Sequence, residues 1–198
     1  NVGNFTMSDV TFSNVGSAFT HGSGQGTVVD ITNFDVSDAS ASCFYFAEDS
    51  VVTMTEGDMD GCNTNGNAGD GAVMSVDGSS AGALTMENVD ISNSKVNLIS
   101  TDLKDVSISN VTGATTSAQS GAALAADGEG ALYVYNLVAD GYSSASIGAM
   151  DSYSLDTVDL GGADVTIVPG GSSSTAAGPS GDSASIVDLT AGDLTMYR

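Results

Sequence analysis

The densest run of hard oxygen ligands in this 198-residue chain lies between residues 58 and 71. Carboxylate and amide oxygens are the donors that Ca²⁺ takes in proteins. No choice of first ligand places a glycine and a closing glutamate where an EF-hand loop needs them. Two interpretations stay open, a calcium site of irregular geometry or a polar turn loop. The calcium ligands would be Asp58, Asp60, Asn63, Asn65 and Asp70.

Catalytic side chains are scarce in this sequence. His21 is the single histidine and stands in a Gly/Ser-rich stretch, so a His-paired nucleophile cannot be assembled anywhere else in the chain. We interpret His21 as an ordinary loop residue. The sequence therefore predicts no catalytic residue, no enzyme activity and no cofactor apart from the calcium just considered.

Charge and hydropathy exclude several classes of partner. The chain carries 25 acidic side chains against three basic ones, for a formal net charge of −22. Phosphate binding needs a basic surface, so a nucleic-acid partner is excluded. An anionic membrane surface or an acidic polysaccharide would be repelled, and no run is long and apolar enough to insert into a bilayer. The sequons at Asn4 and Asn110 predict glycosylation on a secretory route. A glycan stays open as a partner.

A short repeated signature indicates the elements that must position these side chains. In most copies a pair of apolar residues spaced by two precedes a second such pair in the opposite phase, as in 84/86 and 89/91. A spacing of two is strand periodicity, so both pairs face inward only if a bend at Asn88 separates them. Asn and Asp suit the bend because they tolerate left-handed backbone. One column is apolar in all eight copies: Met7, Ile31, Met54, Met86, Leu103, Val134, Leu155 and Met196.

Two further features complete a coil. A second change of phase follows Asn93 or Asn110 and predicts a second corner. A third strand is predicted between the signatures, at 41–46, 71–76 and 121–126. Among the first seven copies, the spacing varies from 17 residues (Met86 to Leu103) to 32 (Met54 to Met86). Such variation favours the right-handed class of solenoid, in which one corner accepts loops of any length.

We therefore predict an all-β fold, a right-handed parallel β-helix (β-solenoid) of about eight coils with irregular loops. The whole chain, 1–198, forms one domain, and a Gly/Ser-rich loop near 161–182 leaves the solenoid at a corner. Cys43 and Cys62 are the only cysteines and fall on neighbouring coils. A disulfide between them is expected in a secreted protein, and two buried thiols are the alternative.

The repeats resemble those of a known family. A Gly-Ala-hydrophobic segment, as at 121–124, combines with a hydrophobic-Thr-hydrophobic-x-Asn segment, as at 84–88. This combination looks like the right-handed β-helix repeats of polymorphic outer-membrane-type surface proteins, and more broadly is similar to the pectate-lyase-like superfamily. The resemblance covers nearly the whole chain and implies the fold. It implies no activity, because Lys95 and Lys104 match no lyase motif and no Arg-x-Lys element of polygalacturonases is present.

The predicted ends of the solenoid indicate a role. The chain starts and stops inside a coil, at 1–7 and 194–198, without a capping helix, and open coil faces expose strand edges and core side chains. We expect self-assembly through both ends, as in a structural subunit of an extracellular filament or cell-surface layer built by head-to-tail stacking. The alternatives are a fragment of a β-helical surface adhesin and a polysaccharide-active β-helix enzyme. Each of these places the chain outside the cell or on its surface.

Overall fold

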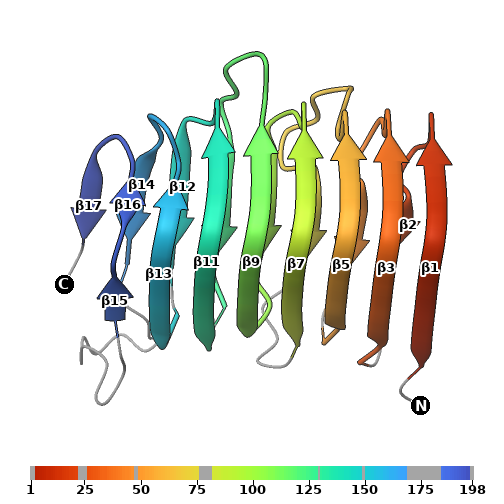
Figure 1. Cartoon of the computed structure of the whole chain (residues 1–198), viewed down its shortest axis with the longest axis horizontal. Helices are drawn as coiled ribbons and strands as arrows, with labels where there is room; N and C mark the ends of the chain where they lie inside the picture. Colours follow the sequence, from red (N-terminus) through yellow and green to blue (C-terminus); the bar gives the residue numbers. More distant parts are fainter. Residues whose placement is uncertain are drawn as a thin grey trace.

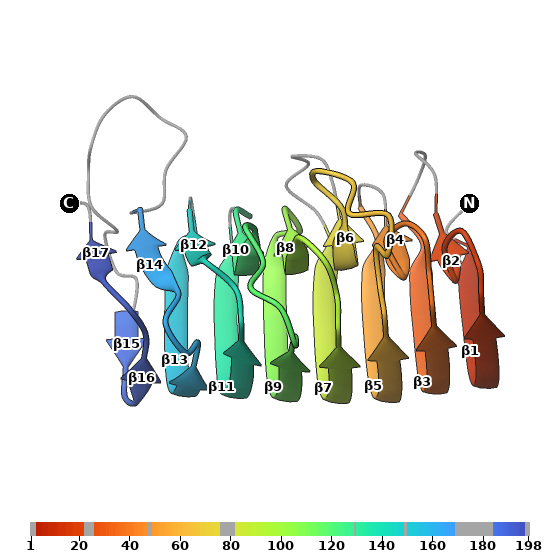
Figure 2. The same ribbon diagram turned by 90° about the horizontal axis from the view of Figure 1, so that it is seen from above.

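The chain alternates between two long parallel sheets, called sheet A and sheet B, and advances by one strand at each turn (Figure 1). In Figure 1 it rises through sheet A in front, descends through sheet B behind and advances from right to left, which makes the coil right-handed. Figure 2 shows the sheets as two facing layers. The computed structural model describes residues 3–21, 26–46, 49–75, 82–128, 130–148, 150–168 and 184–196.

This architecture confirms the predicted all-β solenoid. About six turns are regular, since six strands of sheet A have the full length of ten residues, whereas eight coils were predicted. All regular secondary structure in the described part of the chain is β-strand. Accordingly, none of it forms a helix with the length and apolarity needed to cross a bilayer.

Sheet A contains the long strand of each coil. Its members are β1 (Asn4–Ser13), β3 (Val28–Ser37), β5 (Val51–Asp60), β7 (Ala83–Ser92), β9 (Asp105–Ala114), β11 (Ala131–Asp140), β13 (Ser152–Asp159), β15 (Ala184–Ile186) and β16 (Leu189–Thr190). The last two are short and both pair with β13.

Sheet B contains the shorter strand of each coil. Its members are β2 (Phe19–Thr20), β4 (Phe44–Phe46), β6 (Gly71–Ser75), β8 (Asn97–Thr101), β10 (Ala122–Ala126), β12 (Ser144–Ile147), β14 (Asp164–Ile167) and β17 (Leu194–Met196). The strands β4, β6 and β10 lie within the three segments where a third strand was predicted.

A residue in left-handed conformation bends each long strand of sheet A at one level. Asn88 has φ of 56° in the middle of β7, and inward-facing residues lie on either side of it, as predicted. The other members of this column, with φ from 51° to 56°, are Asp9, Asn33, Glu56, Asn110, Asn136 and Thr157. Asn93, with φ of 53°, marks a second corner at the end of β7. The prediction of a second corner at Asn110 is wrong, because Asn110 belongs to the first column.

Side-chain hydrogen bonds join these bent residues from coil to coil. Asn110 Nδ2 donates to Asn88 Oδ1 at 3.1 Å, and Asn136 Nδ2 donates to Asn110 Oδ1 at 2.9 Å. Asn33 Nδ2 donates to Asp9 Oδ1 in the same way. Left-handed backbone is unfavourable for any residue with a Cβ, and this asparagine ladder offsets part of that cost.

The register of the sheets corrects two members of the predicted apolar column. Ile108 lies beside Met86 where Leu103 was expected, and Ile186 lies beside Leu155 where Met196 was expected. Met196 instead pairs with Ile167 in sheet B. The column does contain the other six: Met7, Ile31, Met54, Met86, Val134 and Leu155.

The error at Leu103 has a cause in packing. The second inward pair of β9 is Val111 and Gly113, and a glycine offers no apolar side chain to reveal the pair. A Cβ on Gly113 would lie 2.3 Å from Leu98 Cδ2, so the side chain of Leu98 in sheet B fills that space. Gly57 in β5 is similar, since a Cβ there would lie 2.1 Å from the Phe34 ring. Large residues thus compensate for small ones inside the core.

Part of the predicted Gly/Ser-rich loop near 161–182 is strand. The residues Asp164–Ile167 form β14 and pair with β12, so the loop prediction is wrong there. Residues 169–182 lie outside the described residues. The strands β15, β16 and β17 continue both sheets beyond this segment.

Replacing Asn110 tests the bend and the ladder separately. Asn110→Ala puts a residue that tolerates left-handed backbone less well than asparagine at φ 51° and removes both ladder bonds, so it should lower the free energy of unfolding by about 1–2 kcal/mol. Asn110→Gly loses the same bonds but tolerates the backbone, so it should lose less. Urea unfolding of both variants measures the difference, and equal stability of alanine and glycine would contradict a left-handed requirement.

Candidate functional site

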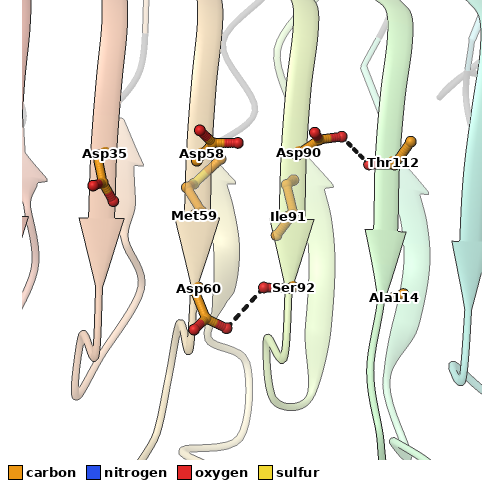
Figure 3. A pocket seen from close by; sticks show the side chains of 9 residues that line it. All are labelled: Asp35, Asp58, Met59, Asp60, Asp90, Ile91, Ser92, Thr112 and Ala114. Carbon is orange, nitrogen blue, oxygen red and sulfur yellow. Dashed lines mark hydrogen bonds between the residues drawn. The ribbon is translucent and has the colours of Figure 1, made fainter.

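A hollow of about 320 Å³ lies on the outer face of sheet A, across β3, β5, β7 and β9 (Figure 3). We call it the acidic groove, because the described residues that line it include four aspartates and no Lys, Arg or His. Its lining consists of Asp35, Asp58, Met59, Asp60, Asp90, Ile91, Ser92, Thr112 and Ala114.

Three of the carboxylates form a row across neighbouring strands. The register pairs Asp35 with Asp58 and Asp58 with Asp90, and adjacent strands lie about 4.8 Å apart. Like charges in such pairs repel each other. The Thr112 hydroxyl donates a hydrogen bond to Asp90 at one end of the row. All three carboxylates are exposed, so water and salt screen the repulsion.

Asp60 has a different environment from the row. Its Oδ1 accepts hydrogen bonds from Asn93 Nδ2 at 2.8 Å and from Ser92 Oγ at 2.7 Å. The bond from Asn93, and then the bond from Ser92, hold the pKa of Asp60 below its usual value of 3.8, against a smaller opposing effect of burial. A general acid at neutral pH needs a raised pKa. Asp60 therefore stays ionised, and the groove presents fixed negative charge to solvent.

The five predicted calcium ligands lie in different surroundings. Asp58 and Asp60 point outward from β5 into the acidic groove (Figure 3), and Asn65 is exposed on the loop after β5. Asn63 is buried, while Asp70 is partly exposed just before β6. No cluster of three His, Cys, Asp or Glu side chains among the described residues could hold a metal ion. The calcium site stays a prediction without a common centre to support it.

Asn63 organises the loop between β5 and β6. Its Nδ2 lies within hydrogen-bond distance of the backbone carbonyl oxygens of Asn67, Asp70 and Lys95, at 2.9, 3.3 and 3.2 Å. Its Oδ1 accepts from the Asn67 backbone N–H at 2.9 Å. The carboxylate of Asp70 in turn accepts from Ser42 Oγ at 3.2 Å. This is the arrangement of a hydrogen-bonded polar loop, the second interpretation of the segment.

The remaining predicted residues occupy separate places. Cys43 lies directly before β4 and Cys62 lies two residues after the end of β5, and a disulfide joins them with their Cα atoms 5.3 Å apart. His21 follows β2, and its ring nitrogens lie within hydrogen-bond distance of two hydroxyl groups, Thr27 Oγ1 at 3.0 Å and Ser50 Oγ at 3.3 Å. The two sequon asparagines are exposed: Asn4 opens β1, and Asn110 belongs to the asparagine ladder.

The search for a dense run of oxygen ligands along the sequence missed most of the acidic groove. It identified Asp58 and Asp60 but not Asp35, Asp90 or Thr112, which come from other coils. A signal was present, because Asp35, Asp58 and Asp90 hold the same position in the repeated signature. Reading down the aligned copies, rather than along the chain, reveals the row.

Comparison of the chain with protein-family models, with curated proteins and with solved structures finds no match. Interpretation of this chain therefore starts from its fold. A fold by itself does not determine function.

Removing one charge from the row should stabilise the protein. Asp58→Asn removes the repulsion with Asp35 and Asp90 and should raise the free energy of unfolding by about 0.2–1 kcal/mol at low salt. The gain should shrink in 1 M NaCl, where the Debye length is about 3 Å. Asp30→Asn is the matched control, because its register neighbours are Thr6 and Thr53. Equal effects of the two substitutions in urea unfolding would contradict the repulsive row.

The lowered pKa of Asp60 should appear in the acid unfolding of the protein. A folded-state pKa below the unfolded value means that ionised Asp60 adds stability above pH 4 or so, and that this stability is lost as the pH falls through the folded-state pKa. Asn93→Gly removes the main hydrogen bond without straining the left-handed backbone. Its cost in free energy of unfolding should therefore be larger at pH 5 than at pH 2. In an Asp60→Asn background that pH dependence should vanish, and its persistence there would assign it to another group.

Proposed function

We propose that this chain is a structural segment of an extended β-solenoid in an extracellular filament or cell-surface layer, and that neighbouring solenoid coils cover both of its end faces. The proposal rests on the way the core reaches the two ends of the described structure. The same apolar columns that are buried in the inner coils are exposed in the outermost ones.

At the first end, the aromatic core continues to the surface. Phe5 on β1 pairs with the fully buried Val29 on β3, yet Phe5 itself is 39% exposed. Its ring lies 4.9 Å from the Phe19 ring, which lies 5.7 Å from Phe46. Among the described residues, this inward-facing aromatic has ring partners on one side only. A further coil on the free side of β1 would bury it.

At the other end, β17 in sheet B also exposes apolar residues that continue a buried column. Leu194 pairs with Val165, and Met196 pairs with Ile167, and both partners are buried. Leu194 is nevertheless 46% exposed and Met196 53% exposed. Soluble proteins seldom leave contiguous apolar faces and unpaired strand edges uncovered, so these residues support an added coil here too.

The two end faces are complementary, so that the β1 end of one copy can stack on the β15 and β17 end of the next. All strands within a sheet are parallel and pair in one direction along the axis, so the free side of β1 and the free sides of β15 and β17 face opposite ways. A contact between unlike faces is heterologous and builds an open filament when it does not close. The disulfide between Cys43 and Cys62 supports an oxidising, extracellular setting, and the resemblance of the repeats to surface-protein β-helices agrees with it.

Self-association of the chain tests the proposal directly. Light scattering should show growth from monomer to elongated particles with rising protein concentration, and electron microscopy should show rods of solenoid width. Because each copy carries a net charge of −22, salt should promote the growth by screening repulsion. Phe5→Lys and Met196→Lys should each reduce it at least tenfold.

The control variant is Val51→Lys, which replaces an exposed apolar residue at the start of β5, in an inner coil. It should leave association unchanged. A chain that stays monomeric at every concentration and salt level would overturn association between copies. Association that Phe5→Lys and Val51→Lys weaken equally would overturn the role of the end faces.

A further inference from the structure

Among the described strands of sheet A, β11 alone presents tyrosines on its outer face. Tyr133 and Tyr135 on β11 are 47% and 43% exposed, and Val138 on the same strand is similarly exposed. On the neighbouring strands the paired positions are small or polar: Ser107, Ser109 and Thr112 on β9, and Ser154, Asp156 and Asp159 on β13. The two tyrosines are therefore the largest side chains on this part of the outer face. Exposed aromatic residues of this kind are typical of binding sites.

A shallow groove of about 220 Å³ begins at Tyr133 and crosses β9 to β7. Its lining provides the hydroxyl groups of Thr85 and Ser107 and the carboxylate of Asp105. Asp105 Oδ1 accepts the backbone N–H of Ala131 at 3.0 Å, which holds the carboxylate at the edge of the groove. The site thus combines flat aromatic faces with hydrogen-bonding groups that can both donate and accept.

Charge decides between the ligands that such a surface could take. Among the described residues, Asp105 is the only charged residue that lines the groove. Asp156 and Asp159 lie beside Tyr135 and Val138, and the chain as a whole carries −22. An anionic ligand would be repelled, and so would the same face of a second copy. A basic ligand would bind better at the acidic groove, where four carboxylates lie together. The ligand that fits is uncharged, with apolar faces for the rings and hydroxyls at its edges.

We propose that the outer face of β11 and its groove bind a neutral glycan chain. Sugar rings stack on Tyr133 and Tyr135, and sugar hydroxyls bond to Thr85, Ser107 and Asp105. This site lies on the side of the solenoid and does not depend on stacking of the ends. A filament subunit with such a site on every copy would bind a polysaccharide at many points, which raises the overall affinity without any further contact.

Native electrophoresis through gels that contain a polysaccharide tests this proposal. Galactomannan, xyloglucan and dextran are the neutral probes, and polygalacturonate is the acidic one. At least one neutral probe should retard the wild-type chain, and polygalacturonate should not. The double variant Tyr133→Ser/Tyr135→Ser copies the paired residues of β9, and its affinity should fall about tenfold.

Tyr45→Ser is the matched control, because Tyr45 is a partly exposed tyrosine on β4 in sheet B. It should bind as the wild type does, and circular dichroism should show the same strand content in all variants. The proposal is overturned if no neutral probe retards the wild type, or if the double variant is retarded as strongly. Loss of poly-L-lysine binding in the double variant, without retardation by any glycan, would assign the face to a basic protein instead.

Discussion

Parallel pairing of each coil with the next is the constraint on which the rest of this structure depends. It requires every turn of the chain to return to the same level and in the same register, although the loops between strands differ in length. The left-handed residue in the middle of each long strand makes this return possible, because it lets both halves of the strand face the core. Four asparagines, one aspartate, one glutamate and one threonine occupy that position. The geometry of the coil thus requires the bend, and several residue types can adopt it.

Much of the fold could be predicted because the coil repeats a physical pattern. The bend at Asn88, the inward column through Met54 and the third strand at 71–75 all follow from the phase of apolar residues. The prediction failed where a glycine faces the core and a side chain from another strand fills the space beside it. Gly113 leaves no apolar mark in the sequence, so the copy containing it was aligned out of register and Leu103 was taken for Ile108. Near the last coil, Met196 imitates the signature by composition but belongs to sheet B.

The candidate sites were harder to predict than the fold, and for a related reason. A solenoid assembles its surface from residues that are 22 to 32 positions apart in the chain, as the hydrogen bonds from Asn110 to Asn88 and from Ser92 to Asp60 show. A search along the sequence therefore found the polar loop at Asn63, which is local, and missed the row of Asp35, Asp58 and Asp90, which is not. The tyrosines of β11 carried no motif at all. Only their outward direction and their small neighbours distinguish them.

In the core, large residues on one coil are matched to small residues on the next, and this match limits which coils the protein can lose during evolution. Phe34 occupies the space that Gly57 leaves open on the next coil. If the coil containing β5 were deleted, β3 would meet β7, and Phe34 would lie against Val89 instead. That contact overfills a close-packed interior. A solenoid of uniform repeats can gain or lose coils during evolution with little cost. Here the coil with Phe34 requires the coil with Gly57 beside it, so that coil cannot be lost without a compensating change in its neighbour.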